Sequence, residues 1–447
     1  MEPFRYHVFV CTQQKPEGVT CCSASGAGKL LESLYRELGR AGLDREVQVS
    51  SCGCLGLCDG GPVMITYPDG VWYSKVQPED VAELVRTHFQ HGQPVVRLQR
   101  TDSAGMKAEI LEHHDRYLAM LKAKDEAGTV PEDLLETVRG FWASRVLLTA
   151  LELDIFNAVG SGSSANDAAH RAATDARATA TLLHALVSLG LLSKQNGSFH
   201  NTPVSTRFLT RNSPDDARGG LLHHANLWER WSRLTDCVRK GTNPPRKHAP
   251  DATQAFIAAM DRNSRERTGA VLKAVGDGVR RMLDLGGGSA AYSIAFAKAF
   301  PELHALVLDV PEVTPITSAY VRDAGLSQRI KVQAGDMLSS PLGEGYDLVL
   351  VSAIAHMFSP AQNQQLCRRA YAALASNGRI VIQDFILDPS RTRPKFAALF
   401  AVNMLVNTDA GGCYTEQEYS DWLQSAGFRD IRRVTLPGPA GLMISTR

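Results

Sequence analysis

The residues with the most evident chemistry are cysteines near the start of the chain. Six of the nine cysteines precede residue 60, and three of them stand in SSCGCLGLCDGG, residues 50–61. In a reducing cytosol, clustered cysteines more often hold a metal or do redox chemistry than form structural disulfides. Zinc usually recruits paired C-x2-C knuckles, and none is found here. Buried thiols without a ligand would not explain the neighbouring glycines, which let a backbone come close to a cluster. The pattern favours an iron–sulfur cluster, with zinc and ligand-free thiols as the alternatives.

A second chemical feature is a glycine-rich turn near residue 285. In RRMLDLGGGSAAYSI, Asp284 precedes Gly286, Gly287 and Gly288, and these glycines let the backbone approach a ligand. Nicotinamide and flavin enzymes share such a turn, so the turn alone does not identify the ligand and the neighbouring residues have to be considered. The carboxylate of Asp284 suits a cationic ammonium group better than a pyrophosphate.

Two further acidic residues follow the next two expected strands. Asp309 ends HALVLD and can accept hydrogen bonds from both hydroxyls of a ribose. Asp336, in AGDM with Met337 beside it, can accept a hydrogen bond from an adenine amino group. A ligand with adenine, ribose and an amino-acid tail is S-adenosylmethionine, which we therefore expect as the cofactor.

The expected strands and helices would bring each group of residues to one edge of a sheet. The first hundred residues predict a small α/β unit whose cysteines lie on loops at strand ends, where they can converge. The C-terminal part alternates helices with five apolar segments, RRMLDL, HALVLDV, RIKVQAGDM, YDLVLVSAIAH and GRIVIQDF. This alternation predicts a Rossmann-like, doubly wound parallel sheet with its ligand at the carboxyl ends of the strands.

The middle of the chain predicts a linker helix followed by a mainly helical winged-helix region. His113 and His114 are adjacent on the charged linker helix, so they point about 100° apart, cannot share one ion and are expected at the surface. Further on, a helix ends at Gly190 and two short strands flank a turn at Asn196–Gly197. The would-be recognition segment ARATATLLHALVSLG offers one arginine, too little to engage phosphates. We expect this region to form a dimer rather than to bind DNA.

Length and charge limit the classes of function. A chain of 447 residues predicts about three domains, which we place at residues 1–100, 101–250 and 251–447. The formal net charge of +1 gives no field toward nucleic acid or an anionic membrane and favours small-molecule partners. The N-terminus lacks an apolar signal region, and no run of ~18 apolar residues occurs, so we expect a cytoplasmic protein.

Residues 4 to about 100 resemble the thioredoxin-like [2Fe-2S] ferredoxins. That family places one cysteine after the first strand, a second four residues before a glycine, and then a C-x3-C pair. The matching positions here are Cys11, Cys22 with Gly26, Cys54 and Cys58. The resemblance implies that these four cysteines hold a [2Fe-2S] cluster, although Cys21 or Cys52 could substitute for a neighbour.

Residues from about 131 to 447 resemble the class I O-methyltransferases that dimerise through an N-terminal winged helix. The motifs are LDLGGG, LVLDVPEV, AGDM, SAIAHMFSP, GRIVIQDF and YTEQEYSDWLQSAGF. In members that deprotonate a hydroxyl, a histidine stands at the position of His356, which the resemblance makes the catalytic base. The usual aromatic and acidic partners are replaced by Met357, Phe358 and Ser359. The alternative for His356 is a purely structural role, because some relatives work through proximity alone.

Together these features predict a homodimeric S-adenosylmethionine-dependent methyltransferase that acts on a small-molecule hydroxyl. The N-terminal [2Fe-2S] domain would be an accessory for redox sensing, for electron transfer with a partner, or for docking. One alternative is a redox protein whose methyltransferase-like part binds its ligand without turning it over. Another is methylation at carbon or nitrogen, for which His356 would be dispensable.

Overall fold

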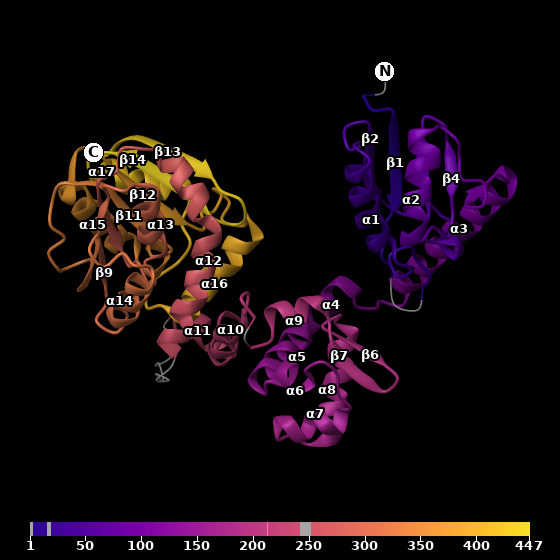
Figure 1. Ribbon diagram of the computed structural model, residues 1–447, viewed down its shortest axis with the longest axis horizontal. Coiled ribbons are helices and arrows are strands. Elements are labelled where there is room, and N and C mark those ends of the chain that lie inside the picture. Colours follow the sequence, from indigo (N-terminus) through magenta and orange to yellow (C-terminus); the bar gives the residue numbers. More distant parts are fainter. Residues whose placement is uncertain (1–2, 16–18, 212, 242–251) are drawn as a thin grey trace. The chain divides into compact units, whose positions relative to one another are not determined.

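The chain forms two compact units, Met1–Gly140 and Phe141–Arg447 (Figure 1). The computed structural model describes residues 3–15, 19–211, 213–241 and 252–447. Within these ranges, every helix is too short or too polar to cross a membrane.

The first unit is built on a mixed five-stranded sheet in the order β2-β1-β3-β4-β5. Its strands are β1 (Tyr6–Cys11), β2 (Val47–Cys52), β3 (Met64–Tyr67), β4 (Val71–Tyr73) and β5 (Gln99–Arg100). β1 is parallel to β2 and antiparallel to β3. Cys11 and Cys52 are register partners at the ends of β1 and β2, so the cysteine loops leave the sheet at one edge, as the sequence predicts.

Alternating apolar residues join this sheet to the first helix. Val8 and Val10 of β1 are fully buried and belong to one apolar cluster with Leu30 and Leu34. The helices are α1 (Ala27–Arg40), α2 (Val81–Leu84), α3 (Ser103–Glu126) and α4 (Glu132–Arg139). Shorter turns are η1 (Cys58–Gly60), η2 (Pro78–Asp80) and the π-helical η3 (Val85–Gln90). The expected linker helix is α3, and the first unit includes it.

The second unit begins with the predicted helical region. Its elements are α5 (Phe141–Glu152), α6 (Ile155–Val159), α7 (Ala165–Ala172), α8 (Ala176–Ser188), β6 (Leu192–Gln195), β7 (Ser198–Asn201) and α9 (Pro203–Phe208). The side chains of Ser164 and Asp175 cap α7 and α8 by accepting backbone N–H groups in the first turn. β6 and β7 pair around the predicted turn at Asn196–Gly197. Three helices follow: α10 (Arg218–Trp231), α11 (Leu234–Lys240) and α12 (Ala252–Val275).

A seven-stranded sheet in the order β10-β9-β8-β11-β12-β14-β13 completes the second unit. Its strands are β8 (Arg281–Leu285), β9 (His304–Asp309), β10 (Ile330–Ala334), β11 (Tyr346–Ser352), β12 (Leu374–Asp384), β13 (Arg429–Thr435) and β14 (Gly441–Thr446). The five predicted strands, β8 to β12, are parallel. The antiparallel strands β13 and β14, which extend the sheet beyond β12, were not among the predicted strands.

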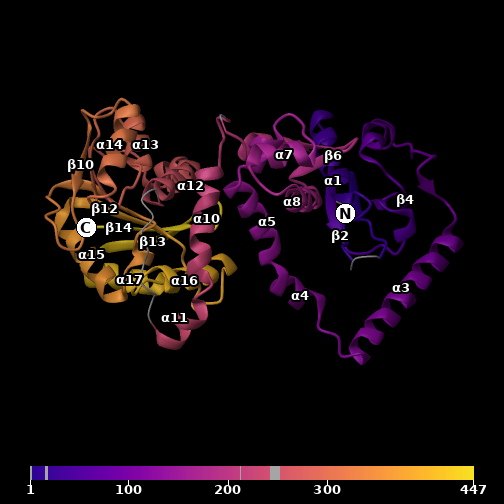
Figure 2. The same cartoon turned by 90° about the horizontal axis from the view of Figure 1, so that it is seen from below.

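Helices cover both faces of this sheet (Figure 2). They are α13 (Ala291–Ala299), α14 (Thr314–Asp323), α15 (Pro360–Ala373), α16 (Lys395–Asn407) and α17 (Glu416–Ser425), with the turn η4 (Ala355–Met357). Along β11, Leu348 and Leu350 join one apolar cluster, whereas Val349 and Val351 join the other. The two-residue alternation of a strand thus buries both faces. This confirms the predicted doubly wound fold class and places the glycine-rich turn at the carboxyl edge.

Candidate functional site

The glycine-rich turn after β8 leaves no room for side chains at Gly286 and Gly287. Gly286 and Gly288 have φ angles of 69° and 55°, in the left-handed region that favours glycine. A Cβ at Gly287 would lie 2.6 Å from Cγ1 of Val307 and 3.0 Å from the carboxyl carbon of Asp284. The turn therefore requires glycine and exposes its backbone in front of α13.

Asp284 lies buried beneath this turn with half of its carboxylate unpaired. Its Oδ2 accepts a hydrogen bond from Oγ of Ser293 at 2.7 Å. Its Oδ1 has no hydrogen-bond partner among the described residues. Burial raises the pKa of Asp284 to about 6, although the Ser293 hydrogen bond opposes this shift. Because an unpaired buried acceptor is unfavourable, the site fits a ligand that brings a cationic N–H donor, such as the ammonium group of S-adenosylmethionine.

The other expected cofactor residues lie at the ends of the two neighbouring strands. Asp309 accepts the N–H groups of Gly288 and Val310, each at 2.8 Å, which fix its carboxylate and leave lone pairs for ribose hydroxyls. Asp336 is exposed after β10, and Met337 is buried beside it. The methyl carbon of Met337 would lie 3.2 Å from a Cβ at Gly286. The parallel order of β8, β9 and β10 brings all the predicted cofactor residues to one edge.

His356 lies on η4, directly after β11, and pairs with a carboxylate from β12. Its Nδ1 is 2.7 Å from Oδ1 of Asp384, and its backbone N–H donates to Oδ2 of Asp384 at 3.0 Å. Both side chains are buried, with 8% and 1% of their surfaces exposed. An ionised carboxylate can only accept, so in the neutral imidazole Nδ1 carries the proton and Nε2 carries the lone pair. Within the described part of the chain Nε2 has no hydrogen-bond partner, which leaves it free to accept a proton.

Aromatic rings from α16 and the end of β12 surround this histidine. The ring of Phe400 meets His356 edge-on at a centroid distance of 5.0 Å. Phe385 lies 4.5 Å from Phe400 and 4.9 Å from Phe396, whose side chain is exposed. On the next turn of α16, Oδ1 of Asn403 accepts a hydrogen bond from Nε1 of Trp231 at 2.9 Å, which ties α16 to α10. The imidazole therefore stands among flat apolar surfaces.

In the first unit the four predicted cluster ligands form two pairs. Sγ of Cys54 and Sγ of Cys58 are 3.4 Å apart. Cys11 and Cys22 are hydrogen bonded to each other, which lowers the pKa of Cys11 to about 6 and raises that of Cys22. A Cβ at Gly61 would lie 3.1 Å from Sγ of Cys22, so a side chain at this position would crowd the sulfur. Two close thiol pairs on loops at one sheet edge fit the four-thiolate ligation of a [2Fe-2S] cluster.

The two remaining cysteines of the cluster region differ in their surroundings. Sγ of Cys21 is buried and accepts the N–H of Ala24 at 3.4 Å, within its own loop. Cys52 is close enough to Cys11 and Cys54 for their charges to matter, but burial is the main reason that its pKa rises to about 11. The Cys21 sulfur is thus engaged within its own loop, whereas Cys52 responds to two of the proposed ligands.

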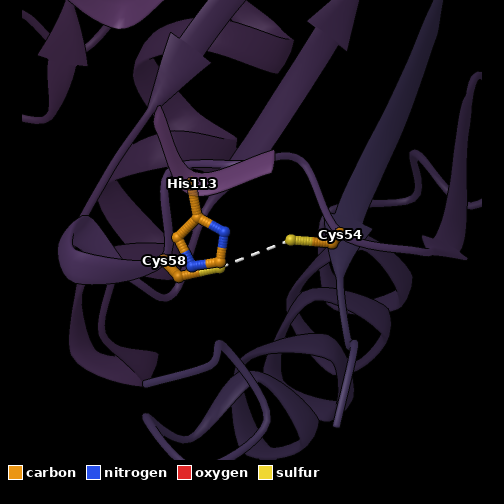
Figure 3. A group of neighbouring side chains, drawn as sticks. All are labelled: Cys54, Cys58 and His113. Atoms are coloured by element: carbon orange, nitrogen blue, oxygen red, sulfur yellow. Dashed lines mark hydrogen bonds between the residues drawn. The ribbon is translucent and has the colours of Figure 1, made fainter. Parts of the chain in front are cut away.

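A lysine and a histidine stand over the Cys54–Cys58 pair. Nζ of Lys15 donates to Sγ of Cys58 at 3.3 Å and lies 3.0 Å from Nε2 of His113. Figure 3 shows the His113 ring over Cys58 with the Cys54 sulfur facing both; their ligand atoms lie within 4.8 Å of one another. Burial and the Lys15 charge lower the pKa of His113. His113 is half-buried, unlike the surface residue that we expected, whereas its neighbour His114 is exposed.

Regions of both compact units match known protein families. Family models match residues 231–429 as an O-methyltransferase domain, 135–211 as an O-methyltransferase dimerisation domain and 2–88 as a thioredoxin-like [2Fe-2S] ferredoxin. The 3-hydroxy-5-methyl-1-naphthoate 3-O-methyltransferase of Streptomyces sahachiroi is 33% identical over 69% of this chain and 92% of its own length. The chain belongs to the O-methyltransferase family.

Other relatives of this O-methyltransferase agree. The tetracenomycin polyketide synthesis 8-O-methyl transferase of Streptomyces glaucescens is 30% identical over 71% of this chain and 97% of its own length. The structure of human N-acetylserotonin methyltransferase in complex with S-adenosylmethionine superposes with a TM-score of 0.63, covers 71% of this chain and 97% of the human one, and is 27% identical. The protein is an S-adenosylmethionine-dependent O-methyltransferase with a dimerisation domain, which indicates a homodimer, and a [2Fe-2S] ferredoxin domain.

The acid that pairs with His356 in this O-methyltransferase was not among the predicted site residues. Asp384 lies 28 residues farther along the chain, whereas the resemblance pointed to a partner directly after the histidine. The available signal was its place at the end of the last parallel strand, IVIQD, next to β11, which leads into the turn of His356. An acid that ends a buried strand at the ligand edge of such a sheet is a candidate site residue.

Proposed function

We propose that this enzyme methylates the hydroxyl of a small aromatic acceptor, with His356 as the general base and Asp384 as its orienting partner. The observation that carries this proposal is the 2.7 Å contact between Nδ1 of His356 and Oδ1 of Asp384. It fixes the tautomer whose Nε2 can take the proton from the acceptor hydroxyl. Asp384 then stabilises the imidazolium that forms.

The proposed cofactor residues hold S-adenosylmethionine at the carboxyl edge of β8, β9 and β10. Asp284 pairs with its ammonium group, Asp309 accepts from the ribose, and Asp336 and Met337 border the adenine. When bound, the sulfonium supplies an activated methyl group. The chain has to align the acceptor oxygen with this methyl carbon, exclude water and remove the proton. Alignment and proton removal both require the acceptor beside η4, where His356 lies.

The aromatic surroundings of His356 support a flat acceptor. Phe385, Phe396 and Phe400 offer ring faces and edges, which prefer stacked or edge-on contacts with another ring. The Streptomyces sahachiroi relative is named for a hydroxynaphthoate, a compound of this shape. A hydroxylated bicyclic aromatic acid is therefore the acceptor class to test first.

We further propose that Cys11, Cys22, Cys54 and Cys58 ligate the [2Fe-2S] cluster and that the cluster domain is an accessory to methyl transfer. Displacement at the sulfonium moves an electron pair from oxygen to carbon and needs no redox centre. The proposed role of the cluster domain is therefore redox sensing, electron exchange with a partner, or docking.

The test of the enzymatic proposal is a mass-spectrometric screen with methyl-labelled S-adenosylmethionine, run anaerobically to protect the cluster. The acceptors are hydroxynaphthoates, with matched naphthoates that lack the hydroxyl. We expect one added methyl group on oxygen, and none with the matched acids. Label on carbon, or transfer that is undiminished in His356→Ala, would contradict the proposed base.

A further inference from the structure

Helix α3 packs against the cysteine loops of its own unit. Met106 is buried in one apolar cluster with Cys11 and Cys22, and Ile110 packs against that cluster. A Cβ at Gly56, between Cys54 and Cys58, would lie 2.8 Å from Cγ2 of Ile110, so the helix lies close on the C-x3-C loop. α3 is therefore part of the cluster region rather than only a connection to the second unit.

Ion pairs reinforce this packing at both ends of the contact. Arg100 donates to Glu109 of α3 at 3.1 Å, and Arg116 of α3 lies 3.8 Å from Asp59, which follows Cys58. The second pair is exposed and contributes little alone. Together with the apolar contacts, these pairs set the face of α3 that meets the loop, and His113 lies on that face.

Lys15 connects this helix to the sulfurs. Its Nζ donates to Sγ of Cys58 at 3.3 Å and lies 3.0 and 3.3 Å from the two ring nitrogens of His113. The ammonium is thus held between an imidazole on one side and the C-x3-C sulfurs on the other.

We propose that α3 is a lid on the C-x3-C end of the cluster site, and that His113 holds the Lys15 ammonium against Cys58, where it raises the reduction potential of the bound cluster. This inference rests on the proposed cysteine ligation. His113 acts through Lys15 and is a positioning residue.

The sign of the effect follows from charge. One-electron reduction adds a negative charge to a cluster that four thiolates already make anionic. A cation beside a thiolate stabilises the more negative, reduced form more than the oxidised form, and an N–H donor to the sulfur acts in the same direction. A half-buried ammonium is screened less by salt than an exposed one. Reduction should in turn strengthen the contact that holds α3, because coupling between two equilibria is reciprocal.

The test is a redox titration of full-length, cluster-loaded protein with dithionite, followed by visible and electron paramagnetic resonance spectra. In Lys15→Met and His113→Ala we expect the ratio of reduced to oxidised cluster at a fixed potential to fall about tenfold, a shift of about 59 mV for one electron. Lys15→Arg keeps the charge and should restore most of the ratio. His114→Ala, the adjacent exposed histidine, is the matched control and should behave as the parent does.

Three outcomes of the titrations would overturn the inference. An unchanged potential in Lys15→Met with an intact spectrum would remove the role of the ammonium. A changed spectrum in His113→Ala would make His113 a ligand instead of a positioning residue. If the parent binds no cluster, the cysteine ligation itself fails. Hydrogen exchange of α3 in the parent gives an independent measurement that needs no variant: slower exchange after reduction supports the lid, and equal exchange in both states contradicts it.

Discussion

At the scale of residues, both proton transfer and binding of S-adenosylmethionine are proposed to depend on a buried carboxylate. Asp384 contacts Nδ1 of His356, and Asp284 has one unpaired oxygen beneath the glycine-rich turn. Each carboxylate is buried where its charge is poorly solvated, so each depends strongly on the group that it pairs with. Removing a partner should therefore have an effect specific to one function, proton transfer or cofactor binding.

His356→Ala should lower kcat by ~10² to 10⁴-fold, because the proton would have no positioned acceptor. Asp384→Asn should also lower kcat, since an amide can donate to Nδ1 and favour the tautomer whose Nε2 is protonated. Affinity for S-adenosylmethionine, measured by calorimetry, should stay near that of the parent in both variants. His304→Ala, at the exposed start of β9, is the control. If the acid limb of the pH–rate profile survives in His356→Ala, another group transfers the proton.

Binding of S-adenosylmethionine should weaken as the pH falls through about 6. Burial raises the pKa of Asp284 to about 6 in the free protein, so its carboxyl binds a proton below that pH. A cationic ammonium prefers the ionised carboxylate, and binding must then release the proton. Calorimetry at pH 6 in buffers of different ionisation enthalpy should detect this release. Asp284→Asn should bind more weakly without proton release, and equal release in that variant would point to a different group.

At the scale of elements, sequence patterns predict the strands that carry the cofactor residues. The five apolar segments become β8 to β12, and the parallel order places their acidic ends together. β13 could not be predicted in this way, because exposed charged residues such as Arg429 and Arg432 interrupt its apolar pattern, as is common for an edge strand. The position of α3 could not be predicted either. Lys15 and His113 are 98 residues apart, and the sequence around one of them does not indicate a contact with the other. The periodicity of apolar residues predicts strands and helices, whereas contacts between side chains of distant elements become visible only in the folded structure.

The loops at the ends of β1 and β2 should tolerate some cysteine replacements and not others. Cys54→Ser and Cys58→Ser remove proposed ligands and should abolish or strongly perturb the visible spectrum of the cluster. Cys21→Ser should leave it largely intact, because the Cys21 sulfur is already engaged by Ala24 within its own loop. Cys52→Ser should also leave it intact. A cluster that is lost only with Cys52 would mean that Cys52 replaces a neighbour as ligand.

At the scale of the whole molecule, the two units carry separate chemistry. The cysteines of the cluster region and Lys15 belong to Met1–Gly140, while His356 and every residue proposed to bind S-adenosylmethionine belong to Phe141–Arg447. The second unit has its own apolar clusters, one in the helical region and two against the sheet. This separation agrees with a chemical step that needs no electron from the cluster, and it can be tested by removing the first part of the chain.

A chain that begins near residue 129 retains α4 and the whole second unit but lacks the ferredoxin-like sheet and α3. It should still form a dimer and bind S-adenosylmethionine as the full chain does, because none of the proposed cofactor contacts is lost. Sedimentation and calorimetry measure these two properties, and labelled methyl transfer measures the rate. Full-length Cys58→Ser is the matched control, since it removes the cluster and keeps the domain. Equal rates in all three proteins support an accessory cluster. A rate that falls in both altered proteins, and returns only with the loaded and reduced domain, would make electron delivery part of the mechanism.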